Sequence, residues 1–250
     1  MIPDDLSTPI LFAHRGASAH APENTLASFR LALEQKAEAI ELDAKLTSDG
    51  VVVVIHDSTV NRTTNGKGKV REIPLTVLRT LDAGSFFSPA FSGERIPTLE
   101  EVFEELGGKL YINVELTNYT SPGDGLVKKV VNLVKKHNLE YRVLFSSFNP
   151  LNLLQARQLL PQTPVGLLTQ AGIEGFLGRS WFGRRIAPKM IHPYLSDTTA
   201  DFIRRQHTLR RRVHVWTVND PAEMRRLFAA GVDGIFTDDP LLARQVLEAG

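Results

Sequence analysis

The chain contains no cysteine among its 250 residues. Disulfide bonds and all thiolate chemistry, including thiolate metal sites, are therefore excluded. The absence agrees with a reducing compartment, and we expect a cytoplasmic location. The first residues, 1 to 6, include two aspartates and lack the basic start and apolar core of a signal peptide.

Long apolar runs and an excess of one charge are also missing. No run approaches the roughly 20 apolar residues that span a bilayer. The formal net charge is +1, so no overall field would attract nucleic acid or an anionic membrane. The basic run 204–212 has no interleaved aromatic residues and is interpreted as a solvated helix face. We expect a small-molecule partner, with no nucleic acid and no stable membrane association, while the oligomeric state stays open.

Short apolar runs alternate with helical stretches along most of the chain. Strands are expected at 9–13, 39–43, 51–55, 110–115, 142–146, 164–168, 185–190, 213–218 and 232–237, and helices at 124–137, 149–159, 197–207, 221–230 and 240–249. Such alternation favours a parallel sheet, because each crossover must return over one face. About eight strand-helix units predict an α/β fold of the (β/α)8 TIM-barrel type. An open doubly wound sheet is the alternative, but no glycine-rich phosphate loop follows any strand.

One segment interrupts this alternation. Residues 58–96 are rich in Thr, Asn, Gly, Ser and Pro. A structureless loop of that length is improbable inside a compact domain, so we expect a small inserted subdomain over the barrel mouth, after the second strand region. Residues 1–250 are accordingly expected to form a single barrel domain that carries this insertion.

Polar residues close three of the apolar runs. His14 and His56 each follow one run, and Glu41 and Asp43 lie two residues apart on another. Residues two apart on a strand point to the same side, so these two carboxylates converge and repel each other unless a cation lies between them. Taken alone, a strand-end histidine is commonly structural and an acidic pair commonly faces solvent. Their combination on neighbouring strands favours an active site.

A third acid, Glu115, ends the run at 110–115. Three carboxylates form an all-oxygen ligand set, which suits a hard cation such as Mg²⁺ or Ca²⁺ and leaves positions for phosphate oxygens. Phosphodiester cleavage requires one proton to be removed and another to be delivered, and His14 and His56 can divide that work. Arg15 adds a forked cation suited to two phosphate oxygens.

These residues lie in a set of ordered motifs that spans nearly the whole chain. The motifs are His14-Arg15-Gly16, Ala21-Pro22-Glu23-Asn24-Thr25, Glu41-Leu42-Asp43, His56-Asp57, Asn61-Arg62-Thr63-Thr64-Asn65-Gly66, Asn113-Val114-Glu115-Leu116, Val215-Trp216-Thr217-Val218-Asn219 and Gly234-Ile235-Phe236-Thr237-Asp238-Asp239-Pro240. In this combination the chain resembles the glycerophosphodiester phosphodiesterases.

The resemblance implies a (β/α)8 barrel with an insertion after the second histidine. It also implies hydrolysis of glycerophosphodiesters to sn-glycerol 3-phosphate and an alcohol. By position, His14 and His56 would be the general acid/base pair, Glu41, Asp43 and Glu115 would hold one divalent cation, Mg²⁺ or Ca²⁺, and Arg15 would bind phosphate. Related phospholipases C use a substrate hydroxyl as the first nucleophile, so a cyclic phosphate intermediate is an open hypothesis here.

The chain departs from the family at Thr117, where many members carry a lysine two residues after the third acid. Lys45, two residues after Asp43, can replace that cation if it faces the same side of its strand. Trp216 and Phe148 are candidates for the wall of the substrate pocket, with packing as the alternative. Residues 23–25 are interpreted mostly as helix capping, and His192 as a loop residue beyond the sixth strand.

Two other functions are compatible with a site of this kind. A sphingomyelinase D or lysophospholipase D would act on lipids through a similar site, but it needs an apolar landing surface, and secreted versions usually have disulfides, whereas this chain has no cysteine. A non-catalytic barrel that binds a divalent ion or a sugar phosphate would have little use for two histidines beside the acids. The preferred alcohol and the choice between Mg²⁺ and Ca²⁺ stay open.

Overall fold

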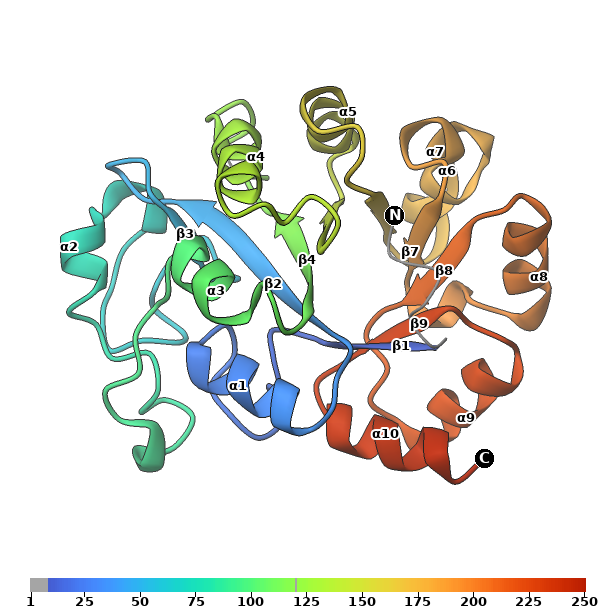
Figure 1. Ribbon diagram of the computed structural model, residues 1–250, viewed down its shortest axis with the longest axis horizontal. Coiled ribbons are helices and arrows are strands. Elements are labelled where there is room, and N and C mark those ends of the chain that lie inside the picture. Colours follow the sequence, from blue (N-terminus) through green and yellow to red (C-terminus); the bar gives the residue numbers. More distant parts are fainter. Residues whose placement is uncertain (1–8, 120) are drawn as a thin grey trace.

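The computed structural model describes residues 9–119 and 121–250, so the first six residues, on which the signal-peptide expectation depends, lie outside the described part. Eight parallel strands form a closed barrel (Figure 1). They are β1 (Ile10–Ala13), β2 (Ala39–Leu46), β4 (Tyr111–Leu116), β5 (Val143–Ser147), β6 (Val165–Thr169), β7 (Met190–Pro193), β8 (Arg212–Val215) and β9 (Gly234–Thr237). Their order is β1-β9-β8-β7-β6-β5-β4-β2, and pairing of β1 with β2 closes the ring. The predicted (β/α)8 barrel is confirmed.

Helices surround the barrel (Figure 1). They are α1 (Leu26–Glu34), α2 (Leu75–Leu78), α3 (Leu99–Leu106), α4 (Leu126–Lys136), α5 (Pro150–Leu159), α6 (Phe176–Arg179), α7 (Trp181–Ile186), α8 (Ala200–Thr208), α9 (Pro221–Ala229) and α10 (Pro240–Glu248). Several begin where the sequence supplies an N-cap: Asn149, Asp220 and Asp239 each accept a backbone N–H and precede a proline. No helix in the described ranges is long and apolar enough to cross a membrane.

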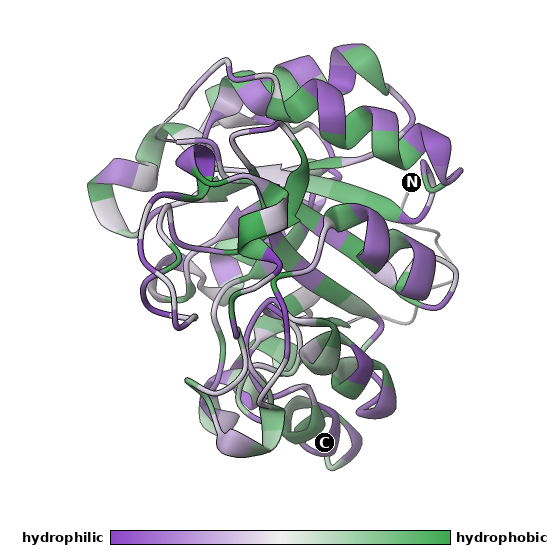
Figure 2. Ribbon diagram, turned by 90° about the vertical axis from the view of Figure 1, so that its left-hand side faces the viewer, coloured by the Kyte–Doolittle hydropathy of each residue, from purple (hydrophilic) through white to green (hydrophobic). Residues whose placement is uncertain are grey.

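Side chains alternate between the two faces of each strand. On β1, Ile10 and Phe12 join the cluster inside the barrel, whereas Leu11 and Ala13 pack outward against the helix layer. The Phe12 ring stacks on Phe236 with ring centroids 4.6 Å apart. Figure 2 shows the result, with apolar colour concentrated on the strands and polar colour on the outer faces of the helices. The interior is therefore a packed core, and space for a substrate exists only at the strand ends.

A ninth strand, β3 (Val52–Val54), pairs antiparallel with the end of β2 and stands outside the barrel ring. The segment after it contains the short 3₁₀ helices Val70–Glu72 and Pro89–Phe91 together with α2. It has a small core of its own, made of Val53, Ile55, Val60, Val70, Leu78, Ala83 and Ile96. Figure 1 shows this inserted subdomain beside β3 at one side of the barrel.

The expected strand at 185–190 is wrong in its position. Residues Arg184 to Ile186 end α7, and β7 begins only at Met190. Ile186 ends α7 and Ala187 follows it, and both are buried. Buried apolar residues fit the inner face of a helix as well as a strand. As a consequence His192 lies within β7 and is completely buried, and is not a loop residue.

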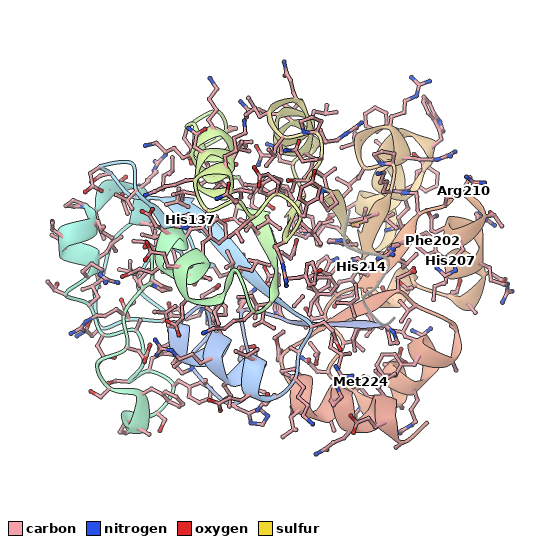
Figure 3. The ribbon with its side chains drawn as sticks, in the orientation of Figure 1. His137, Phe202, His207, Arg210, His214 and Met224 are labelled. Atoms are coloured by element: carbon pink, nitrogen blue, oxygen red, sulfur yellow. The ribbon has the colours of Figure 1, made fainter. Side chains whose placement is uncertain are left out.

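His192 lies against His214 of β8 inside the barrel, with 3.3 Å between a ring nitrogen of each. Figure 3 labels His214. Burial lowers the pKa of both imidazoles, so both are neutral at physiological pH. The basic run at 204–212 is also not uniformly solvated. Arg211 is buried, and its guanidinium donates to Gln206 Oε1 and to the Met190 carbonyl.

Candidate active site

Three acids meet at the carboxyl ends of β2 and β4. Glu41 and Asp43 lie on β2, and parallel pairing sets Asp43 directly opposite Glu115 on β4. One carboxylate oxygen from each of the three lies within 4.8 Å of the others. Glu41 and Asp43 are buried, and Glu115 is partly exposed. The register of two strands thus brings together the three predicted acids.

The three acids differ in their electrostatics. Burial and the neighbouring carboxylates raise the pKa of Glu41, and burial together with Asp43 raises the pKa of Glu115. Burial would also raise the pKa of Asp43, but Arg15 and His56 outweigh it and lower that pKa. Glu41 and Glu115 therefore disfavour ionisation beside Asp43 unless further positive charge is present, as expected where a cation belongs. An all-oxygen set fits Mg²⁺ or Ca²⁺ better than a softer metal.

His14 follows β1 and lies beside Asp238, which follows β9. The two residues are 224 positions apart in sequence, and His14 Nδ1 is 2.7 Å from Asp238 Oδ1. Ser18 Oγ and Asn219 Nδ2 donate to the same carboxylate. Burial would raise the pKa of Asp238, but the hydrogen bonds from these three side chains lower it below its ordinary value. An ionised partner at Nδ1 fixes the orientation of the His14 ring and leaves Nε2 free for chemistry.

Arg15 is held by contacts on both backbone and side chain. Its backbone N–H donates to Glu41 Oε2 at 3.0 Å, its Nη1 donates to Glu23, and its Nε lies 3.5 Å from Asp43 Oδ2. The turn that presents it requires Gly16, since φ there is +84° and a Cβ would lie 2.3 Å from Ser28 Oγ. The guanidinium is thereby fixed beside the acids.

Only Thr25 of the predicted capping segment acts as a cap. Its side chain accepts from the Ser28 N–H at the start of α1. Asn24 instead donates its Nδ2 to Asp43 Oδ2 at 2.9 Å, and Glu23 pairs with Arg15. The capping interpretation is therefore wrong for Glu23 and Asn24, which contact site residues.

His56 follows β3, where the insertion begins, and its side chain is exposed. Its Nδ1 lies 2.8 Å from Oδ1 of the adjacent Asp57. Arg62 donates to both oxygens of Asp57 and to both oxygens of Glu23. Since Glu23 also contacts Arg15, a continuous chain of ion pairs joins the insertion to the loop of His14.

Lys45 reaches toward the position where the family lysine is missing. Its Nζ donates to the Thr117 hydroxyl at 2.8 Å and to the Thr117 carbonyl at 3.1 Å. Burial lowers the pKa of this ammonium, and the carboxylates of Asp43 and Glu115 act in the opposite direction. An ammonium from β2 therefore lies next to the side chain that follows β4.

Phe148 and Trp216 come together beyond the ends of β5 and β8. Their ring centroids are 5.3 Å apart, in an edge-on arrangement. Trp216 Nε1 donates to the His192 carbonyl, which anchors the indole to β7. Tyr119 extends this aromatic wall, with its ring 6.0 Å from Phe148 and its hydroxyl donating to Glu115 at 2.8 Å.

Four residues of the site had no role predicted from the sequence, namely Asp238, Asp57, Arg62 and Tyr119. Asp238 directly follows a buried strand, which is the same signal that identified Glu115. Asp57 and Arg62 lie in two of the ordered motifs, but the pairing of Arg62 with both Asp57 and Glu23 depends on how the insertion folds. A hollow of about 440 Å³ adjoins His14, Arg15 and Asp238.

Acids, an arginine and two histidine–carboxylate pairs around one end of a (β/α)8 barrel define an enzyme site suited to phosphate esters. A family model described as "Glycerophosphoryl diester phosphodiesterase family" matches residues 14–242. The chain belongs to this family and is an enzyme, a phosphoric diester hydrolase.

Individual relatives agree with this assignment. A glycerophosphodiester phosphodiesterase from Caldanaerobacter subterraneus subsp. tengcongensis is 41% identical over 233 residues, covering 92% of this chain and 94% of the relative. A phosphodiesterase from Oleispira antarctica, solved in complex with the product sn-glycerol-3-phosphate, superposes with a TM-score of 0.87 at 31% identity and covers 96% of this chain and 97% of its own. A glycerophosphodiester phosphodiesterase from Agrobacterium tumefaciens gives 0.82 at 29% identity, covering 95% and 100%.

Proposed function

We propose that this enzyme hydrolyses glycerophosphodiesters to sn-glycerol 3-phosphate and an alcohol, with one divalent cation held by Glu41, Asp43 and Glu115. The convergence of three carboxylates within 4.8 Å, two of them with raised pKa values, is the observation that carries this proposal. A bound Mg²⁺ or Ca²⁺ would supply charge stabilisation at the phosphate oxygens. The product named in the Oleispira complex supports the choice of substrate.

His14 and His56 act as the acid/base pair in this proposal. Each has a carboxylate at Nδ1, which favours the tautomer with Nδ1–H and leaves Nε2 to exchange protons. One Nε2 takes the proton of the attacking hydroxyl as the new P–O bond forms. The other delivers a proton to the alcohol oxygen as its bond to phosphorus breaks. The attacking hydroxyl belongs to water or to the adjacent glycerol carbon. In the second case the first product is a cyclic phosphate, and a water molecule must then add to phosphorus and break the ring P–O bond to give sn-glycerol 3-phosphate.

Arg15 binds the phosphate, and Phe148 and Trp216 form a wall of the glycerol pocket. The Arg15 guanidinium is already oriented by Glu23 and Asp43, so binding requires little further ordering. The aromatic wall lies next to Glu115 through Tyr119, which places apolar surface beside the acids. Residues 1–250 act as one catalytic domain in which the 58–96 insertion supplies the surroundings of His56, and a cytoplasmic location stays a prediction.

The experiment is release of glycerol 3-phosphate from glycerophosphocholine and glycerophosphoethanolamine, followed with a coupled dehydrogenase. We expect EDTA to abolish release, and Mg²⁺ or Ca²⁺ to restore it, because the acids repel one another without a cation. Calorimetric titration of metal into the EDTA-treated protein measures the site independently of turnover. Full activity in EDTA, or metal binding that is unchanged in Glu41→Gln and Glu115→Gln, would contradict the metal assignment.

Lys45 is the second phosphate-facing cation in our proposal. It replaces the lysine that many family members carry at the position of Thr117. Lys45→Gln is expected to raise KM by about tenfold or more, because removal of a hydrogen bond to a charged group typically weakens binding by that factor. The double variant Lys45→Gln/Thr117→Lys returns an ammonium to the same place from β4 and is expected to recover most of the loss. Lys128→Gln, an exposed change on α4, is the control. A double variant no better than Lys45→Gln alone would rule out this substitution of one cation for another.

A further inference from the structure

The connection between β6 and β7 exposes an unusual group of apolar side chains. Ile173 lies in the 3₁₀ helix Gly172–Gly175, Phe176 and Leu177 lie on α6, and Trp181 and Phe182 begin α7. Ile173 is 91% exposed, and Phe176, Leu177 and Trp181 are each more than 60% exposed. Together these five residues form what we name the β6–β7 surface. Side chains of this size at such exposure mark an interaction site when they lie together.

Positive charge accompanies the β6–β7 surface. Arg184 and Arg185 are exposed, and the Arg185 guanidinium lies over the Trp181 ring at 4.9 Å from its centroid. Arg179 is not available to a ligand, because it pairs with Asp197 and donates to nearby carbonyls. Glu174 is the acidic residue of this segment. Exposed aromatic and aliphatic side chains next to cations that form no ion pair with an acid of the protein are typical of surfaces that bind anionic lipid.

The β6–β7 surface continues toward the active site. A groove of about 310 Å³ runs between α5 and α6–α7 and is lined by Phe148, Leu167, Leu168, Leu177, Phe182 and Ile186. Phe148 is the residue whose ring meets Trp216. Leu151, near the start of α5, is exposed as well. A mostly apolar zone, with Gln170 and Glu174 also on the groove, therefore extends from the mouth of the site to the protruding residues.

The degree of protrusion indicates what covers this zone. A single hydrocarbon chain in the groove would contact Leu177 and Phe182, but Ile173 and Trp181 do not line the groove and would stay in water. A lipid bilayer can accept all five side chains at once and can pair Arg184 and Arg185 with anionic headgroups. We propose that the β6–β7 surface docks reversibly on an anionic bilayer and thereby holds the mouth of the active site at the membrane. This contact is peripheral and reversible, so it differs from the stable association that the composition argues against.

Flotation with lipid vesicles tests the proposal on the full-length protein. Wild type is expected to float with phosphatidylcholine/phosphatidylglycerol vesicles and more weakly with pure phosphatidylcholine. Trp181→Ser/Phe182→Ser should lower the vesicle affinity by about tenfold or more, through loss of buried apolar area. Arg184→Ser/Arg185→Ser should remove the preference for phosphatidylglycerol. Tyr141→Ser, an exposed aromatic residue outside the β6–β7 surface, should bind as wild type does.

Two further measurements separate docking from other causes. The chain has two tryptophans, so Trp216→Phe leaves Trp181 as the reporter, and its emission should shift to the blue on vesicles. Hydrolysis of soluble glycerophosphocholine by the Trp181/Phe182 and Arg184/Arg185 variants should equal that of wild type, which shows that they fold. Wild type that does not float, or variants that float equally well, would overturn the proposal. Self-association that Trp181→Ser abolishes, without vesicle binding, would make the β6–β7 surface a contact between two copies of the chain and would also overturn it.

Discussion

The two histidine–carboxylate pairs of the site are similar in chemistry and different in origin. His14 and Asp238 come from opposite ends of the chain and meet only because β1 pairs with β9 in the closed barrel. His56 and Asp57 are adjacent in sequence, and they lie at the start of the insertion. The His14 side chain is 20% exposed and the His56 side chain 42%. The two carboxylates differ less, with the Asp238 side chain 34% exposed and the Asp57 side chain 28%. The barrel thus provides a pair with a mostly buried histidine, which we call the enclosed pair, and the insertion provides a locally built pair whose histidine is open to solvent, the exposed pair.

The more exposed pair depends on a connection to the enclosed one. Arg62 holds Asp57 on one side and Glu23 on the other, and Glu23 contacts Arg15, the neighbour of His14. The pKa of Arg62 is raised by its two acidic partners, and the pKa values of Glu23 and Asp57 are lowered by Arg62. These are the directions expected for mutual ion pairing. Ion pairs that are this exposed contribute little stability singly, so their role here is to fix the distance between the insertion and the barrel.

Replacing either histidine should give the largest effect and tests whether the two pairs share one reaction. His14→Ala and His56→Ala are each expected to lower kcat by about 10²- to 10⁴-fold, the usual contribution of a general acid or base. The double variant should lose less than the product of the two, since both groups act on one transition state. The measurement is steady-state turnover of glycerophosphocholine, with circular dichroism as the check on folding. Unchanged turnover in His14→Ala would remove the catalytic role of the barrel pair.

Much of this arrangement could be predicted from sequence where the determinants are local. The period-2 pattern of β2 and the acid at the end of β4 were sufficient to predict that three carboxylates converge, because parallel strands bring their carboxyl ends to one edge. The alternation of strands and helices predicted the barrel, because each crossover must return over one face of a parallel sheet and about eight such units are present.

The rest depends on long-range contacts or on ambiguous patterns. Asp238 could not be paired with His14 without knowing which strands close the barrel. Ile186 and Ala187 are compatible with both a helix and a strand, so the start of β7 and the burial of His192 were missed. The contact between Lys45 and Thr117 requires the register of β2 against β4, which the separate strand patterns do not contain.

Replacing the carboxylate partner of each histidine is expected to lower kcat by less than loss of the histidine itself. The loss should differ between the enclosed and the exposed pair. Asp238→Asn is expected to lower kcat about 10- to 100-fold, because an amide can donate to His14 Nδ1 and favour the wrong tautomer in an enclosed position. Asp57→Asn should cost less than about tenfold, since water can replace the partner of the exposed His56. The pH profile of kcat should move in Asp238→Asn, which a purely structural role would not produce.

A matched control for these variants is Glu105→Gln, which weakens an exposed ion pair with Arg30 on the outside of the barrel. It is expected to leave both kcat and the pH profile unchanged. A larger loss in Asp57→Asn than in Asp238→Asn would reverse the proposed difference between the enclosed and the exposed pair.

The smallest expected effect concerns the free energy of unfolding in acid, and it tests the His14–Asp238 pair alone. The pKa of Asp238 is lowered in the folded protein, because hydrogen bonds from His14, Asn219 and Ser18 outweigh the effect of burial. Asp238 therefore binds its proton more weakly when folded, so its contribution is fully present above its ordinary pKa of about 3.9 and is lost as the pH falls through the lowered value. In urea unfolding of the EDTA-treated proteins, Asp238→Asn should be less stable than wild type at pH 6, and the difference should shrink at pH 3. Because the acids of the metal site titrate equally in both proteins, their effect cancels in the comparison. If the difference in stability between wild type and Asp238→Asn stays constant from pH 6 to pH 3, Asp238 contributes through packing. The hydrogen bond to His14 would then not depend on the charge of Asp238.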